Sequence, residues 1–192
     1  MSLNFDNAKK IDNISKVKGI YMAIDYHPWS EKTIELIVKD LGIVPDNGPQ
    51  AQRTNDYKYH TTICYMDFKK HHLNQKEIEK LVKFTNINGS TIFEEIKPRR
   101  PKIQIPIKII GFGFFNTPTG RNLHLRVKSN FLTSEFNRSK KFGIKYDYRN
   151  YTPHITLKNN VPDDFIIPKE IEKKYINTTL YSNDEYIEAI QN

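Results

Sequence analysis

The sequence predicts an α+β domain with two lobes, in which pseudo-twofold related, mainly antiparallel sheets line a central cleft. Each half of the chain reads as strand, helix and strand, and each half closes on an apolar strand that carries His and Thr two residues apart. A length of 192 residues with 38% hydrophobic and 12% aromatic content suits one domain with its own core. We therefore expect a single domain over residues 1–192.

The first half is predicted to open with a strand at residues 18–26. Ser30 is expected to cap an amphipathic helix, because apolar residues recur at helical spacing at Ile34, Ile37, Val38 and Leu41. The helix should end near Gly42. A loop rich in Pro, Asn, Gly and Gln at 45–56 then leads to the closing strand, YHTTICY at 59–65.

The second half begins with a predicted hairpin, in which strands at 107–115 and 122–127 flank the turn-like sequence TPTG at 117–120. The next predicted element is a helix that ends about Gly143 and carries Phe131, Leu132 and Phe136. After a polar stretch, the half closes on the strand YTPHITL at 151–157. The order of elements thus repeats that of the first half.

An insert at 71–102 separates the two halves. Within it, Asn74 and Glu77 form a capping-box pattern, which predicts a helix at 74–84. The sequence KPRRPK at 97–102 predicts an exposed basic loop.

The two ends of the chain lie outside the two predicted halves. A polar leader spans 1–17, and the tail is predicted to hold a short helix at 169–175 and a strand at NTTLYS, 177–182.

Charge and cysteine content limit the class of protein. A net charge of +8 and a pI near 9.4 favour a polyanionic partner such as nucleic acid or nucleotides. The single cysteine, Cys64, forms no internal disulfide, and the amino terminus lacks the pattern of a signal peptide, so we expect a cytoplasmic protein. No apolar run is long enough to predict a membrane-spanning helix.

The two His-x-Thr motifs indicate the chemistry. Side chains two residues apart share one face of a strand, so His60 points with Thr62 and His154 points with Thr156. If the two halves pack about a pseudo-twofold axis, the two pairs converge. Two imidazoles can act as general base and general acid, while two hydroxyls donate to phosphate oxygens. This set suits phosphodiester chemistry without a metal or cofactor.

A single His-x-Thr triplet in a strand arises by chance, and a histidine is more often structural than catalytic. Two triplets on the closing strands of equivalent halves favour the catalytic interpretation. The other histidines lack this context: His71 and His72 are expected on a polar loop, and His124 on a face of the hairpin, with a ligand or phosphate role as its alternative.

At these residues the chain resembles the two-histidine phosphoesterase superfamily. The blocks KGIYMAIDY, YHTTICYM, NLHLRVKSNFL and YDYRNYTPHITLKNNV are similar to those of one branch, the bacteriophage anti-CBASS cyclic-oligonucleotide phosphodiesterases. The similarity covers residues 18–161. This chain departs from the branch in its longer insert and in Phe115, which stands where relatives have tryptophan.

The resemblance implies a two-lobed two-histidine phosphoesterase fold and an enzyme that hydrolyses 3'-5' linkages of cyclic di- or trinucleotide messengers, blocking bacterial CBASS immunity. It implies that the four motif residues are catalytic. It further implies that Tyr21 stacks on or hydrogen-bonds a nucleobase, that Phe115 supplies a second stacking face, and that a carboxylate near the carboxyl terminus, Glu185, contacts the ligand.

Three alternatives remain at this stage. An RNA-end enzyme of the same superfamily, either a 2',3'-cyclic phosphodiesterase or a 2'-5' RNA ligase-like protein, would use the same four residues on a linear substrate. A non-enzymatic RNA-binding module would use basic loops and exposed tyrosines, but it leaves the repeated motif unexplained. A metal hydrolase is disfavoured, because the sequence has no His-Glu-x-x-His motif.

Overall fold

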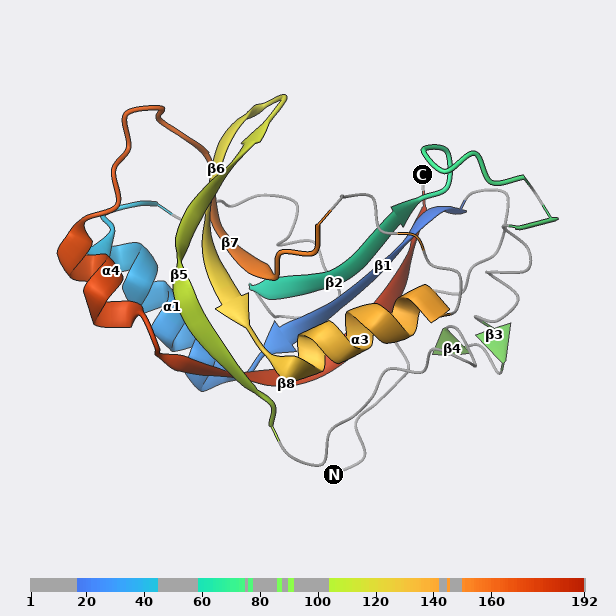
Figure 1. Ribbon diagram of the computed structural model, residues 1–192, viewed down its shortest axis with the longest axis horizontal. Coiled ribbons are helices and arrows are strands. Elements are labelled where there is room, and N and C mark those ends of the chain that lie inside the picture. The colour runs from blue at the N-terminus through green and yellow to red at the C-terminus, as the bar shows by residue number, and fades with distance from the viewer. Residues whose placement is uncertain are drawn as a thin grey trace.

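The computed structural model describes residues 17–44, 59–74, 76–77, 86–87, 90–91, 104–141, 145 and 150–191. Figure 1 shows the elements that these residues form. In chain order they are β1 (Val17–Tyr26), α1 (Pro28–Asp40), β2 (His60–Asp67), β3 (Asn86–Ile87), β4 (Ser90–Thr91), β5 (Pro106–Thr117), β6 (Gly120–Lys128), α3 (Asn130–Lys141), β7 (His154–Val161), α4 (Lys169–Tyr175) and β8 (Thr179–Gln191).

The main sheet consists of two three-stranded halves joined by one short ladder. Its six strands lie in the order β2-β1-β8-β5-β6-β7, and each neighbouring pair is antiparallel. The two halves meet where β5 pairs with β8, and this ladder joins only 106–108 to 179–181. The predicted α+β class with antiparallel sheets is confirmed.

The two halves share one topology. In the first half the middle strand β1 leads through α1 to the edge strand β2, and in the second the middle strand β6 leads through α3 to the edge strand β7. The strand, helix, strand order predicted for each half is therefore confirmed. Each edge strand carries one His-x-Thr motif.

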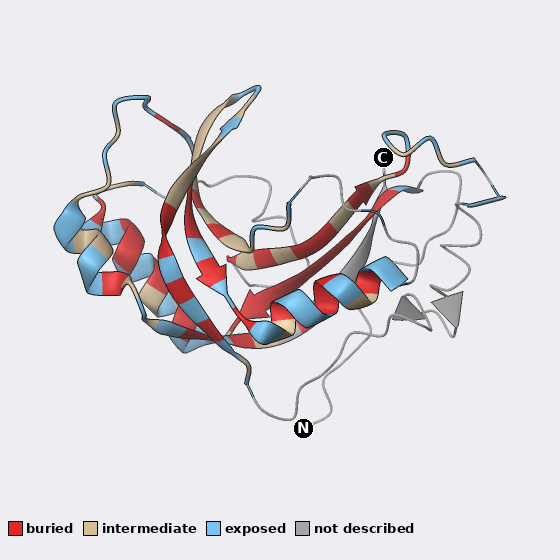
Figure 2. Ribbon diagram, viewed as in Figure 1, coloured by how far each residue is buried: buried red, intermediate tan, exposed pale blue. Residues whose placement is uncertain are grey.

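The sheet bends until its two edges meet. Strands β2 and β7 stand at opposite ends of the strand order, yet they contact each other (Figure 1). Buried residues alternate with less buried ones along β5 and β7, so one face of the sheet belongs to the core (Figure 2). The helices pack on this core face, to which α1 contributes Ile34, Ile37 and Val38 and α3 contributes Leu132 and Phe136.

The start of α1 differs from its prediction. The helix begins at Pro28, and His27 is the N-cap, with its Nδ1 accepting a hydrogen bond from the Trp29 backbone N–H at 3.4 Å. Proline suits a first helical position because its fixed φ is already helical and it has no N–H to satisfy there. Ser30 therefore lies inside the first turn, and the prediction that it caps the helix is wrong. Its hydroxyl instead accepts a hydrogen bond from the Tyr181 backbone N–H at 2.7 Å, which ties α1 to β8.

Most other predicted boundaries agree with the structure. The capping box is confirmed, because the backbone N–H of Asn74 donates to Glu77 Oε2 at 2.8 Å and that of Glu77 donates to Asn74 Oδ1 at 3.0 Å. Gly42 follows the end of α1 with a φ of 66°, and the hairpin and α4 form where predicted. Residues 78–84 of the predicted helix, the loop at 45–56, the basic loop at 97–102 and Gly143 lie outside the described residues.

A buried hydroxyl pair anchors the first motif to the core. Thr61, between His60 and Thr62, is fully buried, and its Oγ1 lies 2.6 Å from the hydroxyl of Tyr26 on β1. Burial of the phenol, partly offset by this hydrogen bond, raises the pKa of Tyr26 far above its ordinary value. The pair therefore stays neutral and joins β2 to β1 directly beneath the motif.

Replacing Tyr26 with Phe should lower the free energy of unfolding by about 1–3 kcal/mol, because the Thr61 hydroxyl then remains buried without its partner. Adding Thr61→Val removes both polar groups and should recover part of that loss. Urea unfolding of the two single variants and the double variant measures the coupling. Strictly additive losses would show that the two hydroxyls do not interact.

Candidate active site

The first motif lies at the start of β2. His60 and Thr62 are half-buried, whereas the neighbouring Thr61 and Ile63 are fully buried in the core. This alternation follows from the period of two along a strand. It places His60 and Thr62 together on the face of the sheet opposite the core, which we call the histidine face.

The second motif repeats this arrangement at the start of β7. His154 and Thr156 are half-buried, and Ile155 and Leu157 are buried in the core. The structure therefore supports the prediction that each His and Thr share a face. In both edge strands the histidine is the first residue.

A contact between the edge strands brings the two motifs together. The Tyr151 hydroxyl, three residues before His154, donates a hydrogen bond to the backbone carbonyl of Thr62 at 3.4 Å. The Tyr151 ring in turn stacks on Phe136 of α3, with centroids 4.2 Å apart. Tyr151, which lies just before the second motif, thus binds the backbone of the first motif.

His154 has a defined tautomer. Its Nδ1 lies 2.8 Å from the backbone carbonyl of Thr152. Because a carbonyl oxygen can only accept, Nδ1 must carry the proton, and in the neutral ring Nε2 then holds a free lone pair. Burial lowers the pKa of His154, although the bond to Thr152 partly opposes this shift. The neutral ring is therefore the favoured form near pH 7.

Two aromatic rings flank His154. Phe115 meets it edge to face at 4.7 Å between centroids, and His124 does so at 5.3 Å. Phe115 and His124 also stack on each other, with centroids 3.9 Å apart and planes 12° apart. Phe115, predicted as a stacking residue, thus lies beside the second motif.

Sequence reasoning underestimated His124. It is the Cα partner of Thr156 and is only 2% exposed, so it belongs to the histidine face beside the second motif. Its pKa is lowered to about 4, mainly by burial and in part by the neighbouring His154 and Arg126, against the opposing effect of a hydrogen bond with the Asn122 backbone. One feature of the sequence could have indicated this position: His124 lies on a predicted hairpin strand, and its cross-strand partner Gly113 leaves room for the imidazole ring.

Tyr21 and Asp25 border the first motif. The Tyr21 ring meets the His60 ring edge to face at 5.8 Å between centroids, which places this predicted binding residue beside the first histidine. Asp25, 3% exposed, is the direct cross-strand partner of His60. Directly opposed residues of an antiparallel pair share a face, so the Asp25 carboxyl group neighbours the imidazole.

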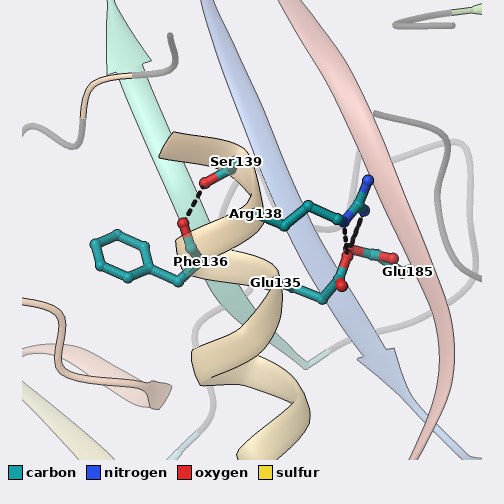
Figure 3. A network of polar contacts seen from close by, with 5 residues as sticks. All are labelled: Glu135, Phe136, Arg138, Ser139 and Glu185. Carbon is teal, nitrogen blue, oxygen red and sulfur yellow. Dashed lines mark hydrogen bonds and ion pairs between the residues drawn. The ribbon is translucent and has the colours of Figure 1, made fainter. Parts of the chain in front are cut away.

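Glu185 lies away from the other predicted residues. It is the cross-strand partner of Ile24, a core residue, and this register turns its side chain toward α3 instead of the histidine face. There its carboxylate is 3.8 Å from Arg138, whose Nε also donates to Glu135 Oε2 at 2.8 Å (Figure 3). The structure therefore gives Glu185 a place in a buried ionic network beneath α3.

The described residues contain no group of three or more His, Cys, Asp or Glu side chains placed to hold a metal ion. Among the described helices, none is both long and apolar enough to cross a membrane.

The chain matches a known family over most of its length. The family model described as "Anti-CBASS protein Acb1" matches residues 18–192. A relative of that description from Salmonella phage S16 is 25% identical over 162 residues, which cover 82% of this chain and 86% of the relative. Another, from Yersinia phage phiR1-RT, is 26% identical over 159 residues, covering 83% and 78%.

A solved structure shares the fold. The crystal structure of E. coli LigT complexed with NADP+ superposes with a TM-score of 0.52 and 15% identity, and the match covers 90% of this chain and 88% of that chain. At this identity the likeness concerns the fold alone. It confirms the predicted two-histidine phosphoesterase-like architecture.

The lowered pKa of His124 should make the protein sensitive to mild acid. An unfolded histidine has a pKa of about 6.5, whereas that of folded His124 is about 4, so the unfolded chain takes up the proton first as the pH falls. The stability that His124 gives above its unfolded pKa is therefore lost toward pH 4. Between pH 7 and pH 5 we expect a loss of about 2 kcal/mol from this residue.

Urea unfolding of the wild type and His124→Asn at both pH values measures this contribution. The variant should lose less stability on acidification than the wild type. His72→Asn, at an exposed turn position, serves as the matched control and should keep the wild-type pH dependence. Equal pH dependence in all three proteins would contradict the prediction.

Proposed function

The chain belongs to the Acb1 family of anti-CBASS proteins, and from this premise we propose that it is a metal-independent phosphodiesterase. Its substrates are cyclic di- and trinucleotide messengers with 3'-5' linkages, and their hydrolysis in the bacterial cytoplasm blocks CBASS immunity. The observation that carries the proposal is the meeting of two His-x-Thr strands, joined by the bond from Tyr151 to Thr62.

His154 acts as the general base. Its Nδ1 donates to the Thr152 carbonyl, so Nε2 is the basic atom, and burial favours the neutral ring. Phe115 and His124 contribute to this burial, since both rings pack against the imidazole. A base that is already deprotonated near pH 7 can take the proton of a substrate hydroxyl.

His60 acts as the general acid. Its cross-strand neighbour Asp25 is a buried carboxyl group on the same face, so a carboxyl group lies beside this imidazole. The two histidines therefore occupy environments of different polarity. Such a difference suits two otherwise equivalent groups to opposite roles, one as acid and one as base.

Thr62 and Thr156 stabilise the phosphate. Each hydroxyl lies two residues after its histidine on the histidine face, so both can donate to the non-bridging oxygens of a phosphate held between the imidazoles. Tyr21 beside His60 and Phe115 beside His154 supply aromatic surfaces for nucleobases. The stacking faces thus lie on either side of the reacting phosphate.

The reaction uses the substrate's own ribose. His154 takes the proton of the 2'-hydroxyl, the 2'-oxygen attacks the adjacent phosphorus, and His60 protonates the leaving 5'-oxygen. This step opens the ring and forms a 2',3'-cyclic phosphate. Water then attacks that phosphate with the roles of the histidines reversed, which leaves a terminal monophosphate.

An RNA-end phosphodiesterase or 2'-5' RNA ligase-like enzyme would use the same four residues. A panel of cyclic di- and trinucleotides, RNAs with cyclic-phosphate ends and linear RNAs, with mass analysis of the products, separates these activities. The proposal expects cleavage of the cyclic oligonucleotides. Turnover confined to RNA ends would favour the alternative, and binding without turnover would favour an RNA-binding module.

Substitution of the four motif residues should lower kcat more for the two histidines than for the two threonines. His60→Ala and His154→Ala should each lower kcat by about 10²–10⁴-fold, the usual contribution of a general acid or base. Thr62→Ala and Thr156→Ala should lower it by about 10–10³-fold through loss of phosphate stabilisation. Steady-state kinetics with excess chelator present tests both the roles and the independence from metal.

The exposed His72→Ala serves as the control and should retain wild-type turnover. Circular dichroism should show that each variant keeps its fold. Full activity in a folded His60→Ala, His154→Ala double variant would overturn the assignment, and loss of wild-type activity on chelation would overturn metal independence.

The nucleophile can be tested on the substrate. A cyclic dinucleotide with hydrogen in place of each 2'-hydroxyl should still bind, because its bases and phosphates are unchanged, but it should not be cut. With the normal substrate, the 2',3'-cyclic phosphate should appear before the monophosphate in time-resolved product analysis. Comparable cleavage of the 2'-deoxy analogue would mean that water, not the ribose, attacks the phosphorus.

A further inference from the structure

Two glycines of β5 make room for two side chains of β6. Gly111 has a φ of 152° and lies at a β-bulge, and a Cβ built on it would be only 2.7 Å from Arg126 Nη2. A Cβ on Gly113 would be 2.8 Å from His124 Nε2 and 3.6 Å from Arg126 Cδ. The Arg126 stem and guanidinium thus extend across a surface that any larger residue would obstruct.

This surface belongs to the histidine face. Arg126 is the Cα partner of His154, and His124 is the partner of Thr156, so their side chains share a face with the second motif. From β6 the Arg126 side chain extends away from β7 and over β5. Neighbouring strands are about 4.8 Å apart, so the guanidinium lies beside the motif residues rather than over them.

Arg126 differs from the other arginines that the structure describes. Arg121 donates to the carbonyls of Pro162 and Phe165, and Arg138 pairs with Glu135. Arg126 is exposed, and no described residue accepts a hydrogen bond from it or forms an ion pair with it. Its immediate neighbour on this surface, His124, is neutral near pH 7, so Arg126 supplies the local positive charge.

We propose that Arg126, held over Gly111 and Gly113, binds a second, non-scissile phosphate of the substrate. The inference rests on the proposed function and adds a specificity-determining residue to it. While Thr62 and Thr156 hold the scissile phosphate, the guanidinium one to two strands away meets the next phosphate of the oligonucleotide. Its planar fork suits bidentate binding of phosphate oxygens. The enzyme therefore prefers substrates with two or more phosphates over single-phosphate diesters.

The test compares two substrates that share the same nucleophile. One is a 3'-5' cyclic dinucleotide, and the other is uridine 3'-(p-nitrophenyl phosphate), which has a 2'-hydroxyl but only one phosphate. The ratio of their kcat/KM values measures the preference for a second phosphate. Arg126→Ala should lower this ratio at least tenfold, mainly by raising KM for the dinucleotide, and Arg126→Lys should recover only part of the loss.

Binding provides a readout that does not depend on turnover. Calorimetry with the 2'-deoxy cyclic dinucleotide should give a Kd at least tenfold weaker for Arg126→Ala than for the wild type. Lys32→Ala on the exposed face of α1, a helix that packs on the core face of the sheet, removes the same charge on the side opposite the histidine face and should change neither the ratio nor the Kd. This control separates a specific contact from a general loss of positive charge.

The outcomes distinguish the two proposals. If the wild type cleaves both substrates but Arg126→Ala has the wild-type ratio and Kd, the second phosphate site is wrong and the proposed function stands. Equal losses on both substrates would place Arg126 at the scissile phosphate and also overturn the inference. If the wild type cleaves neither substrate while Arg126→Ala still weakens the Kd, the phosphate site stands and the proposed function falls.

Discussion

The short ladder between β5 and β8 is the constraint on which the rest of the structure depends. Residues 106–108 pair with 179–181 across it, backbone bonds from Ser182 to Ile105 and from Ile109 to Thr178 flank it, and it connects the two halves of the sheet. Tyr181 stands at one end of it, opposite Pro106: its N–H donates to the Ser30 hydroxyl, and its carbonyl accepts a hydrogen bond from the His27 N–H at 2.9 Å. One residue thus joins α1, β5 and β8, so this junction sets the angle between the halves and, through it, the approach of β2 to β7.

The residues that sequence could predict are those governed by local periodicity. The alternation around His60 and His154 requires only that each motif lie in a half-buried strand, and the capping box at Asn74 requires only four consecutive residues. The direction of the Glu185 side chain depends on the pairing of β8 with β1, which has a register shift between Ile24 and Tyr26 and which no local pattern reveals.

The same limit explains the features that sequence reasoning missed. Ser30 was predicted as the N-cap because serine favours that position. Its hydroxyl instead accepts a hydrogen bond from Tyr181 of β8, a residue distant in sequence. His124 and Arg126 acquire meaning only when Gly113 and Gly111 stand opposite them and β7 pairs on their other side. These are properties of three strands together, so one strand's sequence does not contain them.

The repeated topology supports a site whose two sides differ chemically. In the first half the strand beside the motif places Asp25 and Ala23 opposite His60 and Thr62. In the second half the corresponding strand places Arg126 and His124 opposite His154 and Thr156. A scaffold with two similar halves therefore presents an acidic neighbour to one histidine and aromatic and basic neighbours to the other. This difference allows identical residues to take opposite roles.

The histidine of each motif is the first residue of its strand, and this position affects how the protein can diversify. The connections that lead from α1 to β2 and from α3 to β7 both end directly at a histidine. Just before these histidines, Tyr59 is buried in the core and Tyr151 donates a hydrogen bond to the carbonyl of Thr62, so both motifs are also held from the side of the connection. Exchange of a whole connection would remove one of these anchors, so we expect new substrate preferences to arise more readily from single substitutions on the histidine face.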